Sequence, residues 1–490
     1  MKRVYIKKFL IPAIFGLTII SCSKDIPEIE EKPFVKIDPV PTIIPKGTEK
    51  YLNTGSEYIY NQDSVKTYQL IFNDEDLSKL NADPAKEEYV KAALVFEGDT
   101  ISPVGVRYKG SIGAYAGCLS NPDWTKPSGF KTCVKLSLQV KINWEGRKER
   151  FYDLNKLQFH SQNYDKSQLR ERLGYWLFAE MGVPAPRSVH ARLKVNGQLW
   201  GLFGLTEEID NRFAEYFYKN GKGDIYKEVW PVKPTGVVQS DKAFIDALKT
   251  NEEKPDLSLI REFGSAFANS TKENAKDLVK KYMDVNQIMA YCVVDRAIRH
   301  DDGPFHWYCS DLASCYNHNY YWFEDKKNKK MHLIPWDLDG AFEQISSNNN
   351  IVTRIADKWG NVSGNCEVFS AGDNLYRQRS AACDKLTGAW VEFRTEYADL
   401  KKHLQQNILS DEKTMKQIDI WAKQIEPYIK EADYYYNLGI TNEANKKATT
   451  PTNWNNAVNT LKNQVKTRRG FPLKKKKNLK IFPPTVGKCA

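Results

Sequence analysis

Acidic and amide side chains gather in one short region of the chain. Asp302 precedes a glycine, Asn319 opens a run of aromatic residues, and Asp337 follows the mostly apolar stretch Met331–Trp336. Carboxylate and amide oxygens are the ligands that Mg²⁺ prefers, and Mg²⁺ commonly completes its coordination with the phosphates of a substrate. The pattern predicts metal-dependent chemistry on a phosphate group.

Strands are predicted ahead of this region, where they can hold it rigidly. Apolar and polar residues alternate between residues 66 and 110, and strand patterns return at 131–142, 156–159, 188–195 and 199–205. Asn196-Gly197 lies between the last two strands and is a hairpin signal. The first half of the chain is therefore predicted to be rich in β-strands.

Helices are predicted around and after the strands. One begins at a cap provided by Asp165 or Ser167 and ends at Gly182 and Pro184. Another spans Val285–Ile298 and leads to Asp302, while residues 386–437 are helical and 440–462 are polar loops. A hairpin of strands 320–324 and 331–334 carries Asn319 and Asp337 at its ends. Together these elements predict an α+β fold with a mainly helical second half.

Short motifs between about residues 65 and 430 occur in the order found in one known family. They are Val106-Arg-Tyr-Lys-Gly-Ser111, Phe130-Lys131, Leu169-Arg170, Val195-Asn-Gly197, Gly201-Leu-Phe-Gly-Leu-Thr-Glu207, Asp302-Gly303, His318-Asn-Tyr-Tyr321 and Pro335-Trp-Asp-Leu-Asp339. The Trp-Asp-x-Asp element is the rarest of them. In these motifs the chain resembles the CotH kinase family, the spore-coat protein H type of atypical protein kinases.

The resemblance implies a two-lobed, kinase-like fold and transfer of the γ-phosphoryl group of ATP, with Mg²⁺, to Ser or Thr of a protein. By match, Asp302 is the acid near the acceptor hydroxyl. Asn319 and Asp337 hold Mg²⁺, and Asp339 is a supporting or second ligand. Each residue alone also fits a structural role, since Asp302-Gly303 can be a plain turn.

The same resemblance implies a lysine on the ATP phosphates and an acid that orients it. Lys131 and Lys109 are the two alternatives for this lysine, and Glu207 is the expected orienting acid.

The N-terminus has the order of a secretory signal: basic residues, the apolar run Phe9–Ile20, and Ser21-Cys22. Residues 19–22 resemble a bacterial lipobox, which predicts removal of residues 1–21 and lipidation of Cys22. Residues 22–60 are polar and proline-containing and predict a flexible tether, similar to the tethers of Bacteroidota lipoproteins. We therefore expect a lipoprotein of the cell envelope that is anchored in the outer membrane. The protein could lie on either face of this membrane.

The kinase-like domain is predicted over residues 61–440, followed by a polar and basic extension over 441–490. Residues 451–490 contain ten Lys or Arg and no acidic residue, so the net charge of +11 is concentrated rather than general. Lys474–Lys477 could bind an anionic lipid or glycan, or could be part of a solvated tail. An exported, lipid-anchored chain with a body that is not basic is not expected to bind nucleic acid.

Cysteines occur in near pairs that predict disulfides in an oxidising compartment: Cys118 with Cys133, Cys309 with Cys315, and Cys366 with Cys383. Zinc is the alternative, although the paired Cys-x-x-Cys spacing of zinc sites is missing from the sequence.

Two further functions stay open alongside the kinase. The first is a catalytically silent surface lipoprotein that binds a glycan or protein through a kinase-like scaffold. The second is a metal-dependent hydrolase. This function is less well supported, because the sequence has no His pair at metal-ligand spacing. Whether Asp302, Asn319, Asp337 and a lysine lie together separates the kinase from the silent scaffold.

Overall fold

The computed structural model describes residues 49–111, 114–115, 117–123, 125–133, 135–218, 221–343, 366–370, 377–437 and 450–469. The fold is α+β, as predicted. Cys22, Cys489 and Lys474–Lys477 lie outside the described residues. In the part of the chain that is described, no helix has the length and apolar character needed to cross a membrane.

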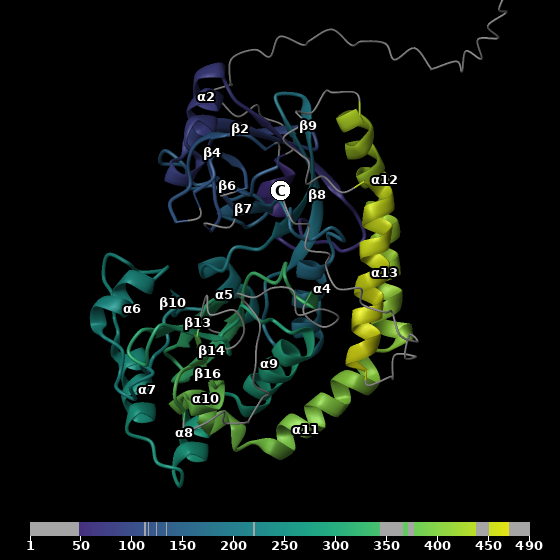
Figure 1. The fold of residues 1–490 in the computed structure, drawn as a ribbon. Coiled ribbons are helices and arrows are strands. Elements are labelled where there is room, and N and C mark those ends of the chain that lie inside the picture. The colour runs from purple at the N-terminus through teal and green to yellow at the C-terminus, as the bar shows by residue number, and fades with distance from the viewer. Residues whose placement is uncertain are drawn as a thin grey trace, which may run out of the picture. The chain divides into compact units, whose positions relative to one another are not determined.

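Seven strands close a barrel in the order β1-β2-β3-β6-β7-β9-β8 (Figure 1). Neighbours are antiparallel except β1 and β8, which are parallel. The interior is filled by aromatic and aliphatic side chains such as Tyr68, Leu94, Phe159 and Phe203. The bounds are β1 Lys66–Ile71, β2 Val90–Phe96, β3 Asp99–Tyr108, β6 Leu138–Lys141, β7 Lys156–His160, β8 Ser188–Val195 and β9 Gln198–Thr206.

The hairpin between β8 and β9 turns at the predicted Asn196-Gly197. Both residues have positive φ, 46° and 81°, which Asn and Gly adopt at little cost. The Asn196 side chain also closes the barrel, because its Oδ1 accepts from Phe72 N at 2.8 Å and its Nδ2 donates to Phe72 O at 3.1 Å.

Short segments flank the barrel strands. The two-stranded sheet of β4 and β5 follows β3, and its bounds, with those of the first helices, are β4 Leu119–Asn121, β5 Ser128–Lys131, α1 Lys50–Asn53, α2 Asp74–Ala82 and η1 Pro84–Lys86. The alternation between residues 66 and 110 predicted strands only, so α2 is a helix that the prediction missed.

A second region contains two small sheets, β10-β13-β14 and β12-β11-β16-β15, among helices. Its core includes Trp230, whose ring centroid lies 5.5–5.8 Å from those of Trp307, Trp322 and Trp390. The sheet strands are β10 Asp224–Lys227, β11 Trp307–Cys309, β12 Cys315–Tyr316, β13 Tyr320–Asp325, β14 Lys330–Pro335, β15 Phe369–Ser370 and β16 Arg377–Arg379.

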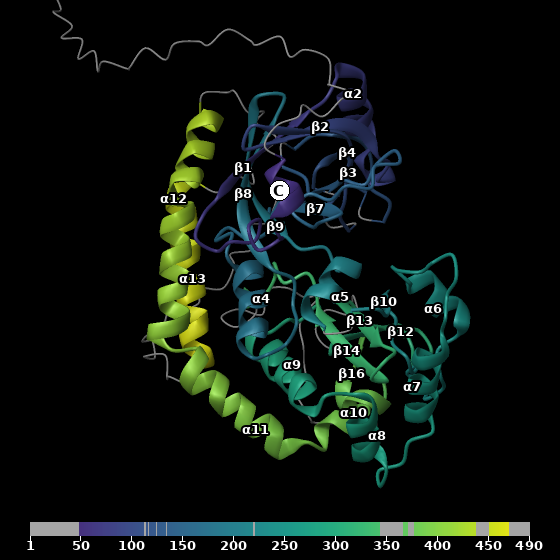
Figure 2. The same cartoon turned by 180° about the vertical axis from the view of Figure 1, so that it is seen from behind.

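The helices of this region include the predicted Val285–Ile298. In Figures 1 and 2 the last two helices run side by side, and the first of them packs along β9. The bounds are α4 Arg170–Glu180, α5 Asn211–Phe217, α6 Asp241–Ala247, α7 Ser258–Ala268, α8 Ala275–Tyr282, α9 Val285–Ile298, η3 Ala381–Cys383, α10 Lys385–Val391, α11 Arg394–His403, η4 Leu404–Ile408, η5 Asp411–Met415, α12 Lys416–Asn437 and α13 Pro451–Arg468.

Helix α13 corrects the prediction of polar loops over 440–462. Trp454, Val458, Leu461 and Val465 are buried and recur at helical spacing on one face, while most other positions are polar. The helical pattern was missed because the segment contains few apolar residues. At the other end, Tyr51 and Tyr60 are buried in the barrel core. The packed part of the chain therefore extends beyond both ends of 61–440.

The three predicted disulfides are confirmed. Cys118–Cys133, Cys309–Cys315 and Cys366–Cys383 are bonded, and Cys292 is a buried free thiol on α9.

Arg172 on α4 joins four parts of the fold. Its guanidinium donates to Gln62 Oε1 and O, to Gln424 Oε1 on α12 at 2.9 Å, and to His190 Nδ1 on β8 at 3.0 Å. The side chain is fully buried, and burial lowers the pKa of Arg172 to about 9. These contacts fasten the chain before β1 to the barrel and to α12.

We expect Arg172→Met to lower the free energy of unfolding by about 2–4 kcal/mol, because it leaves several buried acceptors without a donor while keeping most of the volume. Denaturant unfolding followed by tryptophan fluorescence measures the loss. Lys242→Met is the matched control: its side chain is 83% exposed, and about 0.5 kcal/mol or less is expected. Equal midpoints for both variants would contradict the role of Arg172.

Candidate active site

The β13–β14 hairpin brings Asn319 and Asp337 to one edge of its sheet. Tyr320 pairs with Pro335, so Asn319 directly precedes one strand where Asp337 follows the other. Trp336 N donates to Asn319 O at 3.2 Å and extends the pairing by one step. Both Asn319 and Asp337 have positive φ, 61° and 54°, which turns each backbone out of the strand.

Asp302 lies in the loop between α9 and β11, and two donors hold its carboxylate. Asn319 Nδ2 donates to Asp302 Oδ2 at 2.9 Å and to Asp302 O at 3.0 Å. Tyr308 Oη donates to Asp302 Oδ1 at 2.6 Å. The structure therefore brings together two of the predicted site residues by direct contact. Because Asn319 uses its nitrogen here, its Oδ1 is left as the atom that can ligate a metal.

Helix α4 presses against the segment that contains Asp337 and Asp339. Asp337 N donates to Tyr175 Oη at 3.1 Å. A Cβ at Gly174 would lie 2.8 Å from Leu338 Cδ1, so a larger residue would require the Leu338 side chain to shift. Arg170 Nη1 donates to Ala341 O at 2.7 Å and closes the far end of the segment. The backbone on both sides of the two aspartates is thus fixed by one helix.

The carboxylates of this region repel one another. Burial, and then the Glu171 carboxylate, raises the pKa of Asp337, while His160 and Lys227 act in the opposite direction. Burial, Asp337 and Glu171 together raise the pKa of Asp339 well above its ordinary value. Asp302 contributes to both increases. A cation among these groups would relieve the repulsion.

The candidate metal ligands are all hard oxygen donors. Among the described residues, no three His, Cys, Asp or Glu side chains are arranged to hold a metal ion. The amide oxygen of Asn319 and the carboxylates of Asp337 and Asp339 are hard oxygen donors in a small set, and Mg²⁺ usually binds such sets together with phosphate oxygens.

Lys109, rather than Lys131, lies beside the acids. Its Nζ donates to Gln158 Oε1, is 3.4 Å from His160 Nε2, and lies 5.0 Å from the ring centroid of Trp336. Burial lowers the pKa of Lys109 to about 8, although the carboxylates of Glu208 and Asp337 oppose the shift. The ammonium of Lys109 is therefore in the field of Asp337.

Lys131 lies among aromatic rings at the end of β5. Its Nζ is 4.4 Å from the ring centroid of Trp200 and 5.6 Å from that of Tyr108, and burial lowers its pKa to about 8. These contacts place Lys131 in a cation–π setting instead of an acidic one.

Glu207 is paired with an arginine. Arg187 Nε donates to Glu207 Oε2 at 2.9 Å, and Arg187 Nη2 contacts the other oxygen. The structure thus places the predicted orienting acid in a structural ion pair.

Glu171 is the acid that the sequence prediction missed. Glu171 Oε1 lies 2.7 Å from His160 Nδ1, and His160 Nε2 faces Lys109 Nζ, so a chain of polar contacts runs from α4 to the lysine. Burial would raise the pKa of Glu171, but His160 and Lys109 hold it below its ordinary value. Its position directly after the Leu169-Arg170 motif, in the first turn of a predicted helix, was the available signal.

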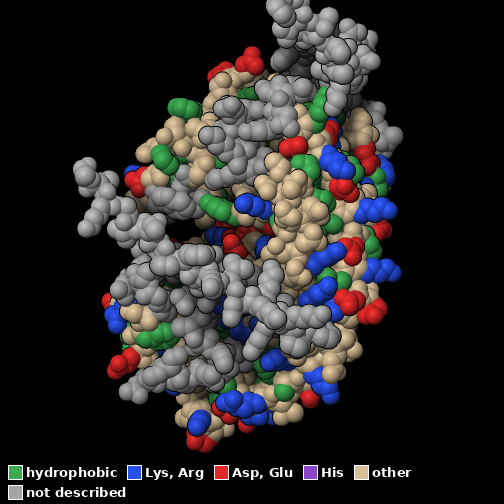
Figure 3. All heavy atoms as spheres, turned by 45° about the vertical axis from the view of Figure 1, so that its right-hand side comes forward, with side chains coloured by type: hydrophobic (Ala, Val, Ile, Leu, Met, Phe, Trp, Pro, Cys, Tyr) green, Lys and Arg blue, Asp and Glu red, His purple; other side chains and the backbone are tan. Residues whose placement is uncertain are grey.

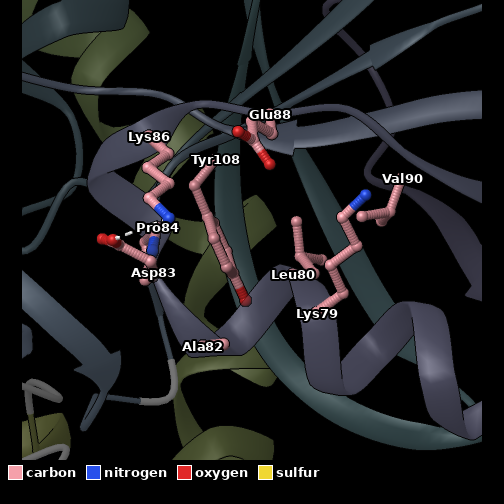
Figure 4. Close-up of a pocket in the computed structure, with 9 residues that line it drawn as sticks. All are labelled: Lys79, Leu80, Ala82, Asp83, Pro84, Lys86, Glu88, Val90 and Tyr108. Carbon is pink, nitrogen blue, oxygen red and sulfur yellow. Dashed lines mark ion pairs between the residues drawn. The ribbon is translucent and has the colours of Figure 1, made fainter.

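A cavity of about 190 Å³ lies elsewhere in the chain, lined by residues of α2, η1, β2 and β3 and their neighbours (Figure 4). Figure 4 shows the Tyr108 ring between Lys86 and Leu80, with Asp83 near Lys86. None of Asp302, Asn319 and Asp337 lines it. A space-filling view shows a hollow in which acidic and basic side chains are both visible (Figure 3).

The sequence is similar to those of known proteins. The sequence model of the family described as CotH kinase protein matches residues 106–471, about three quarters of the chain. The inner spore coat protein H of Bacillus subtilis (strain 168) is similar, with 22% identity over 320 residues that cover 61% of this chain and 78% of that protein. The match contains Glu171, Glu207, Asp302, Asp337 and Asp339 as well as α13. The chain belongs to the CotH kinase family.

Proposed function

We propose that this protein is an exported, lipid-anchored protein kinase that transfers the γ-phosphoryl group of ATP to Ser or Thr of an envelope or secreted protein. The observation that carries the proposal is that Lys109, from the barrel, lies near Asp302, Asn319 and Asp337, which are about two hundred residues further along the chain. Asn319 contacts Asp302, and Trp336 contacts both Asn319 and Lys109. Asp337 interacts electrostatically with Asp302 and Lys109. A silent scaffold has no need for such costly buried charges.

The groups divide the work of phosphoryl transfer. Lys109, oriented by His160 and Glu171, binds the phosphates of ATP. Asn319 and Asp337 would hold Mg²⁺, with Asp339 in support, and a bound ion would neutralise charge on the phosphates. Asp302 orients the acceptor hydroxyl and receives its proton. On this assignment Lys131 and Glu207 serve the structure of the barrel.

The wider architecture and location belong to the same proposal. The barrel and the second region correspond to the two lobes of a kinase. A lipid on Cys22 anchors the protein in the outer membrane, and the basic C-terminal tail contacts anionic lipid or glycan. Support comes from the family match and from the signal-like N-terminus.

We expect Asp337→Ala to abolish Mg²⁺-dependent ATP binding, since a metal ligand acts in the ground state as well as in the transition state. Asp302→Ala should keep ATP affinity and lose about 10²–10⁴-fold in turnover, because Asp302 acts on the acceptor. Calorimetry with Mg²⁺ and radiolabel transfer to the protein itself or to a casein-like acceptor measure the two effects. A wild-type protein that binds no nucleotide would favour the silent, glycan- or protein-binding lipoprotein.

The two lysines give a matched pair of variants. Lys109→Met should weaken ATP binding about 10–100-fold by removing a charge-assisted contact, whereas Lys131→Met should change it less than about threefold. Because the pKa of Lys109 is about 8, wild-type affinity should fall as the pH rises through this value and Lys109→Met should be insensitive there. A larger loss for Lys131→Met would reverse the assignment.

Lipidation is tested separately from catalysis. Cys22→Ala should leave the protein unlabelled by palmitate and released from membranes, because the thioether to the lipid requires the thiol. Cys489→Ala is the control, with normal labelling expected. Wild-type labelling of Cys22→Ala would rule out the anchor without bearing on the kinase.

A further inference from the structure

We propose that Tyr308 is a positioning residue that holds the Asp302 carboxylate in the orientation in which it receives the acceptor proton. The inference rests on the proposed kinase function. Its basis is the pair of donors on the two carboxylate oxygens: Tyr308 Oη at 2.6 Å from Oδ1 and Asn319 Nδ2 at 2.9 Å from Oδ2. With one oxygen held from each side, the carboxylate cannot rotate without breaking a hydrogen bond.

The Tyr308 ring is itself held. It is 3% exposed and stacks on His306, with ring centroids 4.0 Å apart and an interplanar angle of 12°. On its strand, Tyr308 pairs with Tyr316 of β12 on one side and with Gln378 of β16 on the other. The adjacent Cys309–Cys315 disulfide closes the β11–β12 hairpin. The hydroxyl therefore stays at Asp302 by virtue of strand pairing, stacking and a covalent bridge.

The phenol is suited to act only as a donor. Burial first, and the Asp302 carboxylate second, raise the pKa of Tyr308 well above its ordinary value, so the hydroxyl keeps its proton at any working pH. Each Asp302 oxygen retains further acceptor capacity. In transfer, the acceptor oxygen bonds to the γ-phosphorus, the bond from that phosphorus to the ADP oxygen breaks, and the acceptor proton moves to Asp302. Tyr308 keeps its own proton and fixes the orientation of the carboxylate that receives the acceptor proton.

Tyr308→Phe removes the hydroxyl and keeps the stacked ring. We expect kcat to fall about 10–100-fold while KM for ATP stays within about twofold, because small misplacements of a catalytic group have effects of this size. Tyr282→Phe is the matched control: it removes the same kind of bond, 2.7 Å from Tyr282 Oη to Glu262 Oε1, between α8 and α7. It should leave kcat unchanged.

A double-mutant cycle separates positioning from general loosening of the fold. In the Asp302→Asn background, Tyr308→Phe should cause little further loss, since the group that it positions is already disabled. Full turnover of Tyr308→Phe in an otherwise active protein, or strictly additive losses, would overturn the inference and leave the kinase proposal standing.

A readout without turnover covers the case in which wild-type protein transfers no phosphate and the proposed function itself fails. With ¹³Cζ-labelled tyrosine, the Tyr308 resonance is identified by its loss in Tyr308→Phe. The chemical shift of this resonance should change in Asp302→Asn. It should not change in Asp311→Asn, a surface substitution on the same hairpin. An unchanged chemical shift of Tyr308 in Asp302→Asn would contradict the contact between Tyr308 and Asp302 and overturn the inference.

Discussion

The packing of α4 against the segment around Asp337 is the contact on which the candidate site depends. Glycine at 174 permits the close approach to Leu338, and Tyr175 binds the backbone at Asp337. The same helix supplies Glu171 to the lysine and inserts Arg172 between the barrel and α12. A shift of α4 would therefore move Asp337, Asp339, Lys109 and the barrel together. The candidate site and the stability of the fold depend on the same helix.

Charge is concentrated at this contact in a way that packing alone would not produce. Asp337 and Asp339 have raised pKa values because they are buried close to Glu171 and Asp302. Lys109 has a lowered pKa in the same surroundings. Burial disfavours the charged form of each group, and a magnesium–nucleotide complex carries charges that would favour it.

Family membership and local geometry answer different questions. The match over residues 106–471 defines the family, whereas 22% identity to inner spore coat protein H leaves individual roles to be argued from contacts. Arg187 pairs with Glu207, whereas Glu171 reaches Lys109 through His160, and these contacts support the proposed roles of Glu171 and Lys109.

The sequence by itself determined what short-range patterns can encode. The Asn196-Gly197 turn, the helix Val285–Ile298, the three near-pair disulfides and the grouping of Asp302, Asn319 and Asp337 were all predictable, because the residues concerned are neighbours along the chain or on one hairpin. Only the tertiary structure decided which lysine faces the acids and that Tyr308 reaches Asp302. It also revealed α13, whose few apolar residues form a face only against a partner surface. Lys109 and Asp337 are separated by more than two hundred residues, and no local periodicity records that closing the barrel and packing a helix across it bring Lys109 into the field of Asp337.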